Sequence, residues 1–109
     1  MKTYNPGELV LVPLTFTSGS GAKSRPVLVV ADTGDADILA ALITSQARIT
    51  AFDVALTDWS SAGLTLPSIV RVHKLHAVEK SLVTKRLGSL SPADHANVAQ
   101  VLKSLFGNW

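Results

Sequence analysis

The sequence contains no cysteine, so it offers no disulfide framework, no thiolate nucleophile and no zinc–thiolate site. It also lacks long apolar runs: no stretch approaches the roughly 20 apolar residues that span a bilayer, and residues 1–6 lack the apolar core of a signal peptide. The excess of positive over negative charge is small. The net charge of +2 permits a polyanionic partner without requiring one. We therefore expect a cytoplasmic protein that does not associate with membranes.

Aliphatic residues, by contrast, are abundant. Hydrophobic residues make up 47% of the 109 positions, which is enough for a single modest core. The chain shows no internal repeat and no low-complexity segment. We expect one domain over residues 1–109, with strands between residues 7 and 90 and a helix over residues 92–106.

A hairpin over residues 24–46 is the central prediction. Two runs rich in Val, Ile and Leu flank a cluster of Asp and Gly, which is typical of two strands joined by a turn. Neither run alternates between apolar and polar residues, so both faces of the hairpin should be buried. A turn centred on Gly34 and Asp35 would place Ala31 opposite Ile38.

The same register places Arg25 directly opposite Thr44 at the open end of the hairpin. Directly opposed Cβ atoms on antiparallel strands lie about 5 Å apart. A guanidinium and a hydroxyl would then lie side by side at the end of an otherwise apolar hairpin. A slip of one residue would instead put Ser45 or Ile43 opposite the arginine. Alternatively, Arg25 is a solvated edge charge and Thr44 forms a turn.

The remaining elements are shorter. Strand patterns cover residues 7–16, 52–56 and 68–72, and a final strand pair is expected between residues 74 and 90, with a turn near residues 79–81. Lys80, Lys85 and Arg86 should be solvated charges. Ser91 and Pro92 form a typical helix start, a capping hydroxyl followed by proline in the first turn.

Arg71, His73 and His76 are among the polar residues that interrupt the apolar pattern after residue 68. An ionised Arg71 is seldom buried alone, so it should reach a carboxylate such as Glu8 or Asp53, or else a phosphate. His73 and His76 have the spacing of a possible metal pair. On a strand, however, a spacing of three puts the two side chains on opposite faces, whereas metal ligands must converge. We predict no metal site.

Five blocks of sequence, taken together, indicate a family. They are Pro-Gly-Glu-Leu-Val at residues 6–10, Lys-Ser-Arg-Pro at 23–26, Ile-Thr-Ser-Gln at 43–46, Pro-Ser-Ile-Val-Arg-Val at 67–72 and Leu-Gly-Ser-Leu-Ser at 87–91. In this order they resemble the MazF/PemK (Kid) family of type II toxins over nearly the whole chain. The resemblance implies a mainly β fold, an SH3-like small β-barrel of about five to seven strands with a C-terminal helix, of the MazF/PemK/CcdB type.

The resemblance also implies the toxin of a toxin–antitoxin system, a metal-independent endoribonuclease (mRNA interferase) that needs no cofactor and arrests growth. Its partners would be single-stranded RNA, a cognate antitoxin with an acidic tail, and a second copy of the chain in a homodimer. Catalysis is expected from Arg25 and Thr44. The residues expected to contact RNA are Phe16, Lys23, Ser45, Gln46, Arg71 and His73.

One position departs from the family pattern. In the Kid/PemK branch an acidic residue stands two positions after the counterpart of Arg71, where this chain has His73. An imidazole can carry a proton near neutral pH. The loss of the acid nevertheless favours Arg25 and Thr44 as the catalytic pair.

Two other functions remain open on the same fold. Gyrase-poisoning toxins of the CcdB type use a tryptophan near the C-terminus, and this chain ends in Trp109, which we expect to pack against the barrel or to fray. A catalytically inactive SH3-like binding module would keep the barrel without turnover. DNA damage without RNA loss would favour the first, and expression without growth arrest would favour the second.

Overall fold

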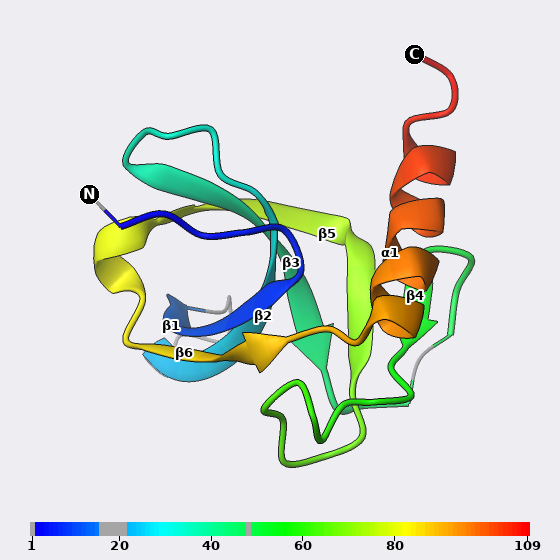
Figure 1. The fold of residues 1–109 in the computed structure, drawn as a ribbon, viewed down its shortest axis with the longest axis horizontal. Helices are drawn as coiled ribbons and strands as arrows, with labels where there is room; N and C mark the ends of the chain where they lie inside the picture. The colour runs from blue at the N-terminus through cyan, green and yellow to red at the C-terminus, as the bar shows by residue number, and fades with distance from the viewer. Residues whose placement is uncertain (1, 16–21, 48) are drawn as a thin grey trace.

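The computed structural model describes residues 2–15, 22–47 and 49–109. Their backbone forms one sheet and one long helix (Figure 1). The elements are β1 (Glu8–Thr15), β2 (Ala22–Ala31), β3 (Asp37–Thr44), β4 (Asp53–Ala55), β5 (Ile69–Glu79), the 3₁₀ segment η1 (Lys80–Leu82), β6 (Lys85–Ser89) and α1 (Pro92–Leu105). None of the helices in these ranges is long and apolar enough to cross a membrane.

The six strands form a single antiparallel sheet in the order β4-β5-β3-β2-β1-β6. In Figure 1 the sheet curls, and α1 lies beside β4 and β5. The predicted mainly β fold with a C-terminal helix is confirmed. Within the described residues no ladder joins β4 to β6, so the sheet ends at these strands and the expected barrel is not closed.

Both faces of the β2–β3 hairpin are buried, as its unbroken apolar runs predicted. Leu9 on β1 belongs to a core that also includes Val98 of α1. Its neighbour Val10 belongs to a second core that includes Tyr4, because successive side chains on a strand point to opposite faces. Each fully buried Val or Leu contributes about 1.5–3 kcal/mol relative to exposure. The helix therefore covers one face, and the N-terminal segment helps to cover the other.

The β2–β3 hairpin keeps the predicted register over the three rungs nearest its open end. Nearer the turn a β-bulge shifts the pairing, so Ala31 lies opposite Leu39 and the predicted pairing with Ile38 is wrong. A bulge adds one residue to one strand and leaves no mark in an apolar run. The bulge lies on the turn side of these rungs, so the predicted register still applies towards the open end. Continued beyond the last paired residues, Val27 and Leu42, this register aligns Arg25 with Thr44.

β5 is one long strand, whereas the sequence predicted two separate strands in this region. Its register with β3 shifts between Ala41 and Leu42, whose partners are Leu75 and Arg71. His73 lies among the extra residues of this bulge. Because the pairing with β3 resumes after the bulge, β5 continues through the point where the sequence pattern predicted a break between two strands.

The C-terminal helix begins as predicted. Ser91 Oγ accepts the Asp94 amide at 3.2 Å and caps the first turn. The buried Asp94 carboxylate accepts the Thr57 amide at 3.0 Å and the Asp58 amide at 2.9 Å. Burial by itself would raise the pKa of Asp94, but these hydrogen bonds outweigh it and hold the pKa below its usual value. The carboxylate thus fastens α1 to the loop after β4.

Candidate functional site

Arg25 and Thr44 lie together at the open end of the β2–β3 hairpin. Arg25 is exposed and Thr44 is half-buried. Both line two hollows, and so do their neighbours Pro26 and Ile43. We call these four residues the shared wall, because they form one side of each hollow.

The larger hollow has a volume of about 330 Å³. Besides the shared wall, it is lined by Leu14, Leu42, Gln46 and Arg71. It therefore brings the guanidinium groups of Arg25 and Arg71 to one concave surface, and we call it the arginine hollow. Guanidinium groups bind carboxylate and phosphate oxygens through paired N–H donors, so this hollow suits an anion.

An aspartate fixes Arg71 in this position. Arg71 Nε donates to Asp53 Oδ1 at 3.0 Å, and the side chains are 18% and 0% exposed respectively. Asp53 Oδ2 also accepts the Thr50 amide at 2.9 Å. Burial alone would raise the pKa of Asp53, but the hydrogen bonds from Arg71 and Thr50 hold it below its usual value. Of the two carboxylates expected as partners of Arg71, Asp53 is the one that binds it. Glu8 pairs with Arg86 instead.

The smaller hollow has a volume of about 170 Å³. Besides the shared wall, it is lined by Ser24, Ser45, Leu64, Thr65, Leu66 and Ser68. Most of its polar groups are hydroxyls, so we call it the hydroxyl hollow. Outside the shared wall, Ser45 is the one residue of this hollow that was predicted to contact RNA, because the outer wall comes from the loop before β5.

Of the other residues predicted to contact RNA, two line these hollows. Ser45 lines the hydroxyl hollow and Gln46 lines the arginine hollow. The Gln46 amide donates to Thr44 Oγ1 at 3.1 Å, so Thr44 also forms the turn that the alternative interpretation expected. Lys23 is exposed and lines neither hollow. Phe16 lies outside the described residues.

His73 is not brought to the shared wall. It is half-buried and lines neither hollow, and its ring centroid lies 5.8 Å from that of Phe52. Its Nδ1 atom is buried without a hydrogen-bond partner among the described residues. His76, by contrast, is exposed. Across the described ranges, no group of three or more His, Cys, Asp or Glu side chains gathers as metal ligands would.

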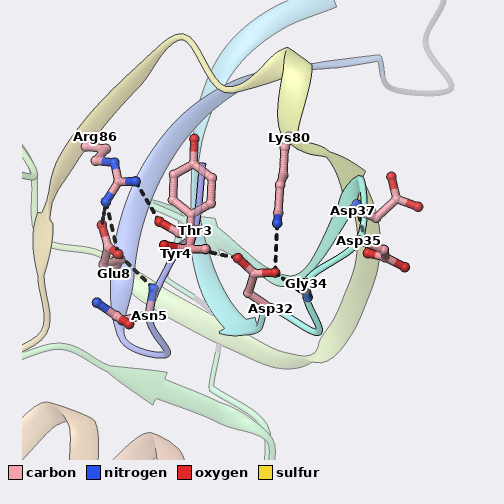
Figure 2. Close-up of polar contacts among 10 residues, drawn as sticks. All are labelled: Thr3, Tyr4, Asn5, Glu8, Asp32, Gly34, Asp35, Asp37, Lys80 and Arg86. Carbon is pink, nitrogen blue, oxygen red and sulfur yellow. Dashed lines mark hydrogen bonds and ion pairs between the residues drawn. The ribbon is translucent and has the colours of Figure 1, made fainter. Parts of the chain in front are cut away.

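A second polar network lies on another part of the molecule, at the N-terminal segment and η1 (Figure 2). Lys80 Nζ lies 2.9 Å from Asp32 Oδ1, and the two side chains are 7% and 5% exposed. The predicted solvation of Lys80 is therefore wrong, because Asp32 holds it in the interior. Asp32 also accepts the amides of Tyr4 at 2.8 Å and Gly34 at 2.9 Å.

The charge on Asp32 is stabilised by these contacts. The hydrogen bond from Lys80, followed by those from the Tyr4 and Gly34 amides, lowers the pKa of Asp32 to about 2. Figure 2 also shows Arg86 reaching Glu8 and the Thr3 carbonyl. This network attaches the N-terminal segment to the rest of the fold. None of its residues was predicted to act in catalysis or to contact RNA.

The chain is similar to known proteins in sequence and in fold. The family model of PemK-like, MazF-like toxins of type II toxin–antitoxin systems matches residues 5–106. No curated protein sequence matches the chain.

Solved structures share the fold. An endoribonuclease from a mycobacterial species is 20% identical, with a TM-score of 0.77 over 100% of this chain and 97% of its own. A mycobacterial endoribonuclease in complex with its cognate antitoxin is 22% identical, with a TM-score of 0.75 over 98% of each chain. A MazE-MazF crystal structure from Deinococcus radiodurans is 22% identical, with a TM-score of 0.78 over 100% of each chain.

Proposed function

The chain belongs to the family of PemK-like, MazF-like toxins of type II toxin–antitoxin systems, and we propose that it is an endoribonuclease that cuts single-stranded messenger RNA and thereby arrests growth. The observation that carries this proposal is the shared wall, where Arg25 and Thr44 both line the two hollows. Solved endoribonucleases with the same fold support it.

The proposed reaction uses a nucleophile that RNA itself supplies. The 2′-oxygen bonds to the adjacent phosphorus while the bond from phosphorus to the 5′-oxygen of the next nucleotide breaks. The products are a 2′,3′-cyclic phosphate and a 5′-hydroxyl. The 2′-hydroxyl loses one proton and the leaving 5′-oxygen gains one, so the step balances without a cofactor or metal. The protein's task is to stabilise the extra negative charge on the pentacoordinate phosphorus.

Arg25 and Thr44 are assigned to this task. The Arg25 guanidinium is a cation that carries N–H donors in a fixed fork that matches phosphate oxygens. Thr44 Oγ1 accepts the Gln46 amide, and a hydroxyl that accepts one hydrogen bond can still donate another. Thr44 would thus orient a phosphate oxygen while Arg25 neutralises the developing charge.

The surrounding residues would hold the strand on either side of the cut. Arg71 would bind a neighbouring phosphate in the arginine hollow, and the exposed Lys23 would add a weaker contact outside it. Ser45 and Gln46, which line different hollows, would contact the bases on the two sides. We assign no step to His73, because it lines neither hollow.

We also propose two protein partners. Solved structures with this fold include complexes with antitoxins. A cognate antitoxin with an acidic, partly disordered tail would complement the two cations of the arginine hollow and fold as it binds. A second copy of the chain would complete a homodimer.

The test is cleavage of a long single-stranded RNA by the purified protein in EDTA. We expect cuts with 2′,3′-cyclic phosphate ends, and Arg25→Ala should lower the rate by about 10²–10³-fold, the usual cost of removing one donor that stabilises developing charge. Lys103→Ala, which removes an exposed positive charge from α1, should cut like the native chain. Intact RNA, or full activity in Arg25→Ala, would contradict the assignment.

One observation favours the gyrase-poisoning alternative. Of the two expectations for Trp109, packing against the barrel is wrong, because the residue is fully exposed, as an end that does not pack would be. Phe106 nearby is 48% exposed. Two exposed aromatic residues at the C-terminus are suited to contact another protein. DNA damage in expressing cells that persists in Arg25→Ala and disappears in Trp109→Ala would support this second candidate.

A further inference from the structure

The hydroxyl hollow has a preformed outer wall. This wall is a loop whose Leu64 amide donates to the Trp59 carbonyl at 3.1 Å and whose Ser68 carbonyl accepts the Leu56 amide at 3.0 Å. Inside the loop, Ser68 Oγ donates to the Leu66 carbonyl at 2.8 Å. These hydrogen bonds hold the wall in place before any ligand arrives, as in most small-molecule sites.

The lining suits an uncharged ring with polar edges. Among the described lining residues, five carry hydroxyls: Ser24, Thr44, Ser45, Thr65 and Ser68. A hydroxyl can donate or accept, so it can match the mixed donor and acceptor edge of a nucleobase. Leu66, which is 57% exposed, adds an apolar surface for the face of a ring. Among the described residues that line it, Arg25 is the only charged one, and it belongs to the shared wall.

The two hollows differ in size. The hydroxyl hollow measures about 170 Å³ and the arginine hollow about 330 Å³. A cavity of about 150 Å³ is known to hold one benzene ring. The hydroxyl hollow is therefore on the scale of one six-membered ring, whereas the second ring of a purine would have to displace Leu66 or remain in water.

We propose that the hydroxyl hollow selects a pyrimidine base directly beside the scissile phosphate. This inference rests on the proposed endoribonuclease function and adds a base preference to it. With the phosphate held at Arg25 and Thr44, one flanking base enters the hydroxyl hollow and the strand on the other side crosses the arginine hollow. Leu66 and Thr65 then become the specificity-determining residues, Leu66 by limiting size and Thr65 by offering a hydroxyl to the base edge.

The experiment is cut-site mapping by primer extension on a long RNA of mixed sequence. The native chain should cut with uracil or cytosine at one fixed position next to the broken bond. Leu66→Ala enlarges the hollow and should raise cutting next to purines by about tenfold, since small changes in pocket size alter discrimination by about 10–200-fold. Thr65→Val keeps the shape, removes the hydroxyl, and should change the ratio of uracil to cytosine.

Leu82→Ala is the matched control, because Leu82 is also exposed, at 42%, but lies on η1 and lines neither hollow. It should leave the cut-site profile unchanged. Cutting beside purines and pyrimidines alike by the native chain would overturn the inference while leaving the nuclease intact, and so would identical profiles for Leu66→Ala and Leu82→Ala. Uncut RNA would reject both the nuclease and the base preference.

Discussion

Two aspartate–cation pairs in this molecule have similar chemistry and different surroundings. Asp32 pairs with Lys80 at 2.9 Å, and Asp53 pairs with Arg71 at 3.0 Å. Both aspartate side chains are almost inaccessible, and both have a pKa below the usual value. The difference lies in the cation. Lys80 is 7% exposed inside the fold, whereas Arg71 is 18% exposed and lines the arginine hollow.

The chemistry of the two cations explains why Lys80 is buried whereas Arg71 is partly exposed. The Lys80 ammonium is a compact charge on a flexible stem, suited to neutralising a single buried carboxylate. Arg71 spends its Nε donor on Asp53, and the planar guanidinium carries further donors that can bind a phosphate. One kind of ion pair can therefore fasten a chain segment in one place and orient a ligand-binding group in another. Activity and stability should therefore respond differently to the same mutation at the two pairs.

The largest expected effect separates the two aspartates. Asp53→Ala should lower the RNA cleavage rate by about 10²-fold, because Arg71 loses its fixed orientation and small misplacements carry costs of that size. Asp32→Ala makes the same chemical change at the other pair and should leave the rate per folded molecule unchanged. Single-turnover rates, corrected for the folded fraction by circular dichroism, give the comparison. Equal losses of rate would show that Asp53 has only a structural role.

The next effect concerns stability. Lys80→Met keeps an aliphatic side chain of similar length and removes the ammonium group, which leaves the Asp32 carboxylate without its cation. We expect a lower thermal unfolding midpoint at pH 7 and no change in cleavage rate below that midpoint. Lys85→Met, at an exposed position on β6, is the control and should unfold like the native chain. A Lys80→Met midpoint equal to the control would mean that the pair contributes nothing.

The smallest effect is a change in acid sensitivity. The pKa of Asp32 falls from 3.8 to about 2 on folding, so below pH 3.8 the unfolded chain binds a proton that the folded chain does not. The contribution of Asp32 to stability is therefore complete above pH 3.8 and lost as the pH falls towards 2. Asp32→Asn should flatten the fall in stability over this interval in urea titrations. An unchanged slope would contradict the depressed pKa.

Sequence patterning located much of the candidate site. The hairpin register that aligned Arg25 with Thr44 followed from the spacing of two apolar runs around a turn, and the structure brings both residues to the shared wall. The same reasoning failed nearer the turn, at Ala31, because a bulge is decided by pairing between strands and not by composition. Lys80 was misassigned for a related reason. Its partner Asp32 is 48 residues away in the sequence, and no local pattern connects them.

By itself, the sequence determined the class of fold, the approximate positions of most elements, the buried character of both hairpin faces, and the family. All of these depend on periodicity, capping residues and the order of short motifs. Only the tertiary structure decided that Arg71 turns to Asp53 rather than Glu8, that His73 is held away from the shared wall, and that the loop before β5 forms the hydroxyl hollow. These outcomes depend on which distant segments pack together. Packing is set by the summed burial and hydrogen bonding of the whole chain, which no short stretch of sequence contains.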